Sequence, residues 1–177
     1  GASALDLDMQ GRVLHHADIV RTAEGVLLDV PSAQLDSFLS FLQKMVFWSQ
    51  VEVTEAELAV LTLLGAAGDV ALPAAVVASR KVDWSAVERR DLLVPRSELK
   101  AVVAELRAAG VEPAGLMAFT AERVRALEPE RAADLDEKSI PHEVPSFIGR
   151  GDRAGAVHLE KGCYRGQETV ARVENLG

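Results

Sequence analysis

The sequence predicts an α+β fold, because hairpin-like pairs of short apolar runs alternate with segments of helical periodicity. Apolar runs at residues 13–20 and 26–30 flank the turn residues Ala23-Glu24-Gly25, which is typical of an antiparallel hairpin. Residues 35–45 and 99–106 carry apolar side chains at helical spacing. With 177 residues, of which 49% are hydrophobic, the chain is long enough for one domain or two small subdomains.

The first part of the chain is expected to form a strand, a hairpin, a helix and a further strand. Leu5–Asp8 predicts a short strand that ends at the Gln10-Gly11 turn. Ser32 is a plausible N-cap for the helix that follows the hairpin. Val51–Thr54 is expected to be the next strand. This order is typical of a split β-α-β unit.

A similar order is expected further along the chain. Strands are predicted at Leu58–Leu64, Ala74–Ala78 and Asp91–Pro95. A helix capped by Ser97 should end at Ala109-Gly110, and another helix is expected over residues 114–127. The polar segment from Asp83 to Arg90 lacks a clear period, so it divides two predicted α+β subdomains, residues 1–82 and 83–177.

The last third of the chain has weaker periodicity. Residues 128–153 are charged and aperiodic, and such long segments are usually functional or disordered. Residues 154–159 predict a short strand, and residues 169–173 predict a β-rich stretch after the single cysteine.

Composition excludes several classes of protein. The net charge of −8 argues against a general binder of nucleic acids or anionic membranes. The most apolar stretch, residues 58–78, is interrupted by glycine, aspartate and proline, so no membrane span is expected. Because Cys163 is the only cysteine, one chain cannot form an internal disulfide, an all-cysteine zinc site or a four-thiolate iron–sulfur cluster. A reducing compartment such as a bacterial-type cytoplasm is the expected location.

The residues around Cys163 are the most informative in the chain. Lys161 and Arg165 each lie two residues from Cys163, and nearby cations stabilise a reactive thiolate. Gly162 and Gly166 would allow the backbone to turn tightly and approach a ligand. The alternative is a buried structural cysteine, because free cysteine is among the most buried residue types.

The octapeptide Lys161-Gly162-Cys163-Tyr164-Arg165-Gly166-Gln167-Glu168 resembles the Lys-Gly-Cys-Tyr-x-Gly-Gln-Glu signature of the YgfZ-type folate-binding proteins. These proteins are relatives of the glycine-cleavage aminomethyltransferase, the T-protein. The resemblance extends to four further segments: Leu7–Val13, Asp91–Arg96, Arg123-Val124 with Pro129, and Ile140–Glu143.

The resemblance implies a tetrahydrofolate-binding accessory protein that supports the assembly or repair of iron–sulfur enzymes, and through them a tRNA modification. Its partners would be a folate, and iron–sulfur assembly factors or client iron–sulfur enzymes. The implied fold has two ferredoxin-like α+β subdomains and a C-terminal β-barrel. The chain begins at Gly1 and ends at Gly177, so we expect it to lack part of the first subdomain and the barrel.

The resemblance also implies roles for individual residues. Glu143 should accept two adjacent N–H groups of the pterin, as the equivalent glutamate does in the T-protein relatives; otherwise it is a solvated surface glutamate. Cations should face the glutamate tail of the folate. Tyr164 should either stack on or border the pterin, or pack at the rim of the sheet. Cys163 would be the reactive or cluster-handling thiol, and no metal site is expected within one chain. The predicted cofactor-binding residues are Glu143, Arg123, Lys161, Tyr164, Gly162, Gly166, Gln167 and Glu168, with Arg165 as a further cation.

Two other functions remain open on the sequence. A true aminomethyltransferase would move a one-carbon unit to tetrahydrofolate, whereas a non-catalytic interaction module would have a degenerate folate cleft. His142 and His158 flank the motif, but no fixed set of nucleophile, base and orienting residue is recognisable. His15 and His16 should point to opposite faces of a strand, with a surface or edge role. Trp48 and Trp84 are expected to pack or to border the cleft.

Overall fold

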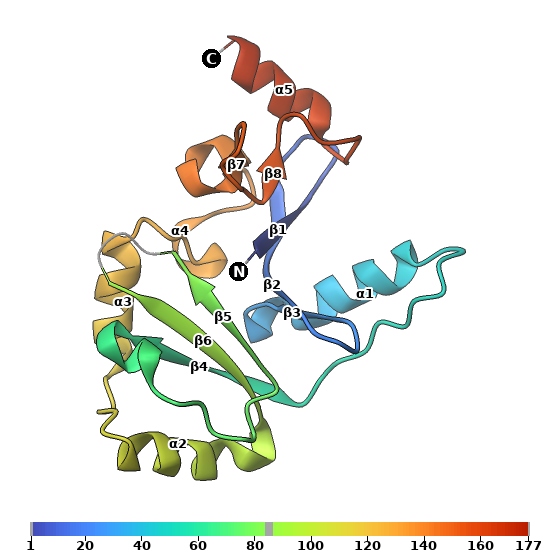
Figure 1. Cartoon of the computed structure of the whole chain (residues 1–177). Helices are drawn as coiled ribbons and strands as arrows, with labels where there is room; N and C mark the ends of the chain where they lie inside the picture. The colour runs from blue at the N-terminus through green and yellow to red at the C-terminus, as the bar shows by residue number, and fades with distance from the viewer. Residues whose placement is uncertain (1, 84–86, 177) are drawn as a thin grey trace. The chain divides into compact units, whose positions relative to one another are not determined.

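Within residues 2–83 and 87–176, which the computed structural model describes, the chain has an α+β fold (Figure 1). This part contains two three-stranded antiparallel sheets, one pair of short parallel strands and five α-helices. The chain divides into two compact units. The middle unit consists of residues 55–126 with the turn at 22–25, and the split unit consists of residues 2–21, 26–54 and 127–176.

This division differs from the sequential one expected at residues 82 and 83. After the middle unit, the chain returns to the strands at its beginning. Arg131 Nε donates to the Val13 carbonyl at 3.2 Å, and the Val13 N–H donates to the Ser139 carbonyl at 2.8 Å. Leu7 and Val13 also share a buried cluster with residues from the last third: Ile148, Val157 and Val170. The N-terminal strands therefore belong with the cysteine segment rather than with residues 55–82.

The split unit begins with the predicted strand and hairpin, which the structure confirms. Its sheet has the order β1-β2-β3. The helix predicted after the hairpin is also present. The segment Val51–Thr54 is not a strand: Val51 is exposed, and these residues pair with no strand in the described part of the chain. The elements of this first part are β1 (Ala2–Leu7), β2 (Val13–Arg21), β3 (Val26–Asp29), the 3-10 turn η1 (Ser32–Gln34) and α1 (Leu35–Met45).

The second part of the split unit contains short elements and one longer helix. The aperiodic segment forms helical turns tied to β2 by the two hydrogen bonds given above. The predicted strand near residue 157 is confirmed in a shorter form and pairs in parallel with a strand from the aperiodic segment. The elements are α4 (Arg131–Asp134), η4 (Pro141–Glu143), η5 (Pro145–Phe147), β7 (Ile148–Gly149), β8 (Val157–His158) and α5 (Gln167–Leu176).

Helix α5 corrects the β-rich stretch predicted over residues 169–173. Thr169, Val170 and Val173 favour strands as isolated residues. In the structure, the Val170 N–H donates to the Gly166 carbonyl at 3.2 Å, which begins the helix. Val170 is buried in the cluster with Leu7 and Val13. Tertiary packing of one helix face therefore outweighs the local β propensity.

The middle unit has a sheet with the order β4-β6-β5 and one face covered by a helix. The strands predicted at 58–64 and 91–95 and both helices are confirmed. The strand predicted at 74–78 is wrong, because the observed strand begins only at Ala78. The elements are β4 (Leu58–Leu64), η2 (Gly65–Asp69), β5 (Ala78–Val82), β6 (Arg89–Pro95), η3 (Arg96–Glu98), α2 (Leu99–Ala108) and α3 (Leu116–Arg125).

The entry into α1 and the entry into α2 follow the same local plan. In each case a Val-Pro pair lies at the end of a strand or directly after it, and a 3-10 turn leads into the helix. Pro31 and Pro95 have nearly the same backbone angles, with φ of −54° and −56°. Ser32 and Ser97 lie inside these turns and make no side-chain cap, so both predicted N-caps are wrong. Proline pre-sets φ at the entry to each turn, and no side-chain cap is formed there.

A buried charged cluster lies on the sheet of the middle unit. Asp91 on β6 has 0% exposure, and Arg80 and Arg89 each donate to it through two nitrogens at 2.8–3.1 Å. The Thr62 hydroxyl also donates to Asp91 at 2.8 Å. The guanidinium of Arg89 lies 5.5 Å from the ring centre of Phe119 on α3. Because the carboxylate is enclosed by donors, its charge can be kept away from water.

Two sequence expectations concern exposure and membranes. Trp48 is 99% exposed, so the expectation that it packs is wrong, and Trp84 lies outside the described residues. No helix among the described residues is long and apolar enough to cross a membrane.

Candidate functional site

The segment 160–166, here called the cysteine loop, connects the end of β8 with α5 in the split unit. Cys163 is exposed, so the alternative of a buried structural cysteine is wrong. A Cβ atom added to Gly162 would meet no other atom within 4 Å. The thiol therefore lies on the surface of the unit beside open space, where another molecule can reach it.

Gly166 anchors one end of the cysteine loop on the β1–β2 turn. It has a φ of +80°, and a Cβ atom there would lie 2.7 Å from both the Asp8 carbonyl oxygen and the Gly11 Cα. Gly11 also has a positive φ, of +77°. The glycine of the Gln10-Gly11 turn and the second glycine of the motif thus meet backbone to backbone. Gly166 was expected to let the backbone approach a ligand. In the structure, its missing side chain instead lets the loop approach the β1–β2 turn.

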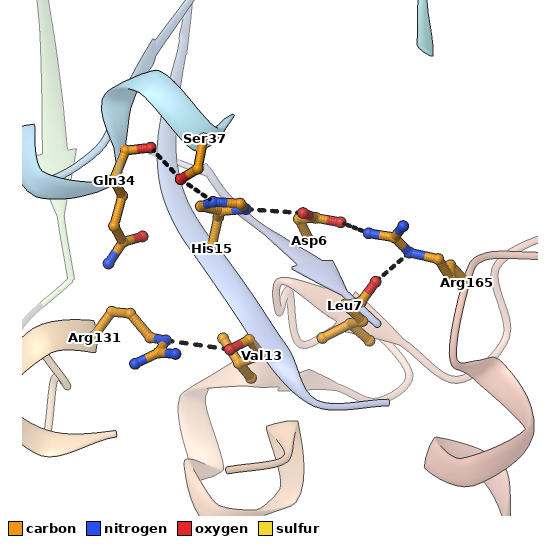
Figure 2. A network of polar contacts seen from close by, with 8 residues as sticks. All are labelled: Asp6, Leu7, Val13, His15, Gln34, Ser37, Arg131 and Arg165. Atoms are coloured by element: carbon orange, nitrogen blue, oxygen red, sulfur yellow. Dashed lines mark hydrogen bonds and ion pairs between the residues drawn. The ribbon is translucent and has the colours of Figure 1, made fainter. Parts of the chain in front are cut away.

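Arg165 anchors the cysteine loop on β1 (Figure 2). Its Nε donates to the Leu7 carbonyl and its Nη2 donates to Asp6. The guanidinium lies 4.8 Å from the ring centre of Phe41 on α1. Arg165 is therefore held by the protein on three sides, although the sequence suggested it as a cation for the folate tail.

Tyr164 and Lys161 contact each other within the loop. Tyr164 is half-buried and packs on the cluster that contains Leu7 and Val13. Burial raises the pKa of the Tyr164 hydroxyl above its usual value. The Lys161 ammonium lies 4.8 Å from the centre of the tyrosine ring, close enough for a cation–π contact. The ring thus serves as a packing group and supports the one lysine of the loop.

The last two motif residues belong to α5. Gln167 is the first residue of the helix, and its N–H donates to the Tyr164 carbonyl at 3.2 Å. Glu168 is exposed and lies 3.7 Å from Arg172 one helical turn later. Acidic residues in the first turn of a helix interact favourably with the helix dipole. Gln167 therefore closes the loop onto the helix, and Glu168 faces solvent.

Glu143 is exposed and ends the short turn η4. Its Oε1 accepts the Ile140 N–H at 2.9 Å, which holds the carboxylate in one orientation. A carboxylate oxygen has two lone pairs, so both oxygens can still accept donors from a ligand. Its neighbour His142 lies 3.2 Å from Glu174 on α5, so η4 is joined to the helix that follows the cysteine loop. Glu143 and Cys163 consequently belong to one unit.

Glu174 also receives two hydrogen bonds from Arg150, at 3.0 and 2.6 Å. The hydrogen bonds from Arg150, and then that from His142, lower the pKa of the Glu174 carboxyl. The same contact raises the pKa of Arg150. His158 instead lies 3.0 Å from the Gly151 carbonyl oxygen. Neither His142 nor His158 is hydrogen-bonded to Cys163 in the described residues, so the thiol has no histidine base there.

Arg123 belongs to the middle unit, unlike the other predicted ligand residues. It is 6% exposed on α3. Cys163, the rest of the motif and Glu143 thus lie in the split unit, and Arg123 lies in the middle unit.

The sequence did not reveal a polar network next to the cysteine loop. Asp6, His15 and Ser37 form a chain of contacts that reaches Arg165 (Figure 2). His15 and His16 do face opposite ways, since His15 packs against Phe38 and His16 against Phe147. His15 is only 8% exposed, however, so its expected surface or edge role is wrong. The available signal was the position of His15 in the predicted strand 13–20, which follows the strand of Asp6 across the Gln10-Gly11 turn; in the structure the two residues are paired.

Comparisons with known proteins give no relative for the chain: no protein-family model matches it, and no curated protein sequence matches it. Within residues 2–83 and 87–176, no group of three or more histidine, cysteine, aspartate or glutamate side chains is arranged to hold a metal ion. The structural features that bear on function are the exposed Cys163 and the anchored cysteine loop of the split unit.

Proposed function

We propose that the chain is a tetrahydrofolate-binding accessory protein that supports iron–sulfur cluster assembly or repair, and tRNA modification that depends on it, in a reducing compartment such as the cytoplasm. The observation that carries this proposal is the exposed Cys163 on a loop anchored at Arg165 and Gly166. A thiol meant only for packing would be buried, whereas a thiol that meets a partner must be accessible.

The proposal assigns the folate to the carboxylate of Glu143. Its orientation by the Ile140 N–H supports this role, because an oriented carboxylate loses little side-chain entropy when it accepts two pterin N–H groups. The Lys161 ammonium is the proposed cation of the motif for the acidic tail of the folate. We further propose that both units are parts of ferredoxin-like subdomains, which agrees with a three-stranded antiparallel sheet in each.

Anaerobic calorimetric titration with tetrahydrofolate tests the folate part. Glu143→Gln keeps the shape but removes the charge, and it should weaken binding about tenfold or more, the effect of losing a charge-assisted pair. Glu137→Gln, an exposed glutamate six residues earlier, is the matched control and should bind normally. The absence of binding heat and of a thermal shift for the unmodified chain would reject both the accessory protein and the aminomethyltransferase, and would favour an interaction module.

A cell-based assay tests the thiol. Cys163→Ser should reduce the activity of iron–sulfur enzymes in cells that depend on this protein, while folate affinity stays normal. Glu143→Ala should show a larger loss of folate affinity than Cys163→Ala. The reverse pattern would mean that the two roles are exchanged, and turnover of an aminomethyl-lipoyl substrate would identify an aminomethyltransferase instead.

A further inference from the structure

A chain of polar contacts crosses the split unit from α1 to the cysteine loop (Figure 2). The Ser37 hydroxyl donates to the Gln34 carbonyl at 3.0 Å, and Ser37 Oγ lies 2.8 Å from His15 Nε2. His15 Nδ1 lies 2.8 Å from Asp6 Oδ2, and Arg165 donates to Asp6 Oδ1. The four side chains from Ser37 to Arg165 are here called the relay. It links one helix, two strands and the cysteine loop.

Both ring nitrogens of His15 are engaged in the relay. Nε2 lies against the Ser37 hydroxyl, which itself donates to the Gln34 carbonyl. Nδ1 lies against Asp6 Oδ2, and Arg165 donates to the other oxygen of the same carboxylate. Asp6 is therefore held between the His15 ring and the Arg165 guanidinium.

The end of β1 supplies the second attachment of Arg165. The pairing of β1 with β2 shifts by one residue between Asp6 and Leu7, as in a β-bulge. Bulges disrupt the ladder locally and are over-represented beside functional sites. At this position the Leu7 carbonyl accepts the Arg165 Nε–H. Arg165 thus binds a carboxylate and a backbone carbonyl of neighbouring residues with two nitrogens of one planar group.

We propose that Arg165 is a positioning residue that holds the cysteine loop, and with it Cys163, against β1, and that Asp6 and His15 orient Arg165. The side chain has its Nε and Nη2 engaged and one face against Phe41, so its charge is already paired with the Asp6 carboxylate. Lys161 is the other cation of the loop. The inference rests on the proposed function only in treating Cys163 as the functional thiol.

Amide hydrogen exchange, measured without folate, tests directly whether Arg165 holds the cysteine loop against β1. The amides of Gln167 and Val170 donate to the loop carbonyls of Tyr164 and Gly166, so their protection reports whether the loop stays in place. Arg165→Met keeps an unbranched stem beside Phe41 but loses both hydrogen bonds. Exchange at the two amides should rise about tenfold, which corresponds to about 1.4 kcal/mol of lost hydrogen bonding. Arg172→Met, which removes an exposed ion pair from α5, is the matched control.

The amide of Val13, which donates to the Ser139 carbonyl, is an internal reference for global unfolding and should keep its protection in Arg165→Met. A nitroxide label on Cys163, the single cysteine, should become more mobile in Arg165→Met but not in Arg172→Met. Arg165→Lys keeps the charge and can make one of the two contacts, so it should rescue part of the effect.

A double-mutant cycle separates positioning through Asp6 from a local effect of Arg165. Asp6→Asn should loosen the loop, and combining it with Arg165→Met should add little, because both substitutions break the same contact. Full additivity, or an Arg165→Met chain that behaves like Arg172→Met, would overturn the proposal. Neither result depends on folate binding, so failure of the proposed function remains distinguishable from failure of this inference.

Discussion

The two glycines of the cysteine motif provide a direct test of how the loop is built. Gly166→Ala would place a Cβ atom 2.7 Å from the Asp8 carbonyl oxygen and 2.7 Å from the Gly11 Cα, both backbone atoms. Its φ of +80° costs an L-residue about 1–2 kcal/mol. Overpacking against backbone adds about 1–3 kcal/mol. The substitution should therefore destabilise the split unit by about 2–5 kcal/mol.

The control lies in the same motif. Gly162 does not have a positive φ, and an added Cβ would meet nothing within 4 Å, so Gly162→Ala should change stability by less than about 0.5 kcal/mol. For a chain of this size, 2–5 kcal/mol corresponds to a fall in Tm of roughly 4–20 °C. Urea and thermal unfolding followed by circular dichroism measure both variants. Equal stability of Gly166→Ala and Gly162→Ala would refute the close approach of the loop to the β1–β2 turn.

Two further predictions concern buried and paired charges. Asp91→Asn leaves Arg80 and Arg89 without their shared anion, so urea unfolding should show a loss of about 3–5 kcal/mol, whereas the exposed control Asp69→Asn should be nearly neutral. The lowered pKa of Glu174 contributes stability that is fully present above its ordinary value of 4.5 and is lost as the pH falls through the lower folded value. The urea concentration at the unfolding midpoint should therefore fall less between pH 6 and pH 3 in Glu174→Gln than in the unmodified chain. An equal fall in both would contradict the contact with Arg150.

The elements predicted well are those with a complete local pattern. The hairpin at 13–29 has alternating burial and a turn signal, and α2 has an apolar stripe that ends at Gly110 with a φ of +89°. The elements predicted wrongly depend on distant contacts. Residues 169–173 form a helix because Val170 packs on Leu7 and Val13, more than 150 positions earlier in the chain. Such a partner cannot be read from local propensity.

The candidate site shows the same division between local and distant information. The spacing of the motif indicated that Cys163 and its neighbours belong together, and the exposed thiol agrees with a functional role. The sequence did not indicate that Arg165 would face Asp6 or that Gly166 would meet Gly11, because those contacts join segments separated by about 155 residues. The sequence suggested that Arg165 activates Cys163, whereas in the structure Arg165 is paired with the Asp6 carboxylate on β1.

The anchors also determine what a partner of Cys163 would encounter. The loop is held on one side by Leu159 and Tyr164, which pack on the core, and on the other by Arg165 and Gly166. An anchored backbone has already lost the conformational entropy that a mobile loop would lose on binding, about 1–2 kcal/mol per residue. A Cβ atom added to Gly162, the residue before Cys163, would meet nothing within 4 Å. If a partner binds at Cys163, as proposed, its affinity should depend on the anchoring residues as well as on the cysteine. A variant that loosens the loop should then weaken binding even with the thiol intact.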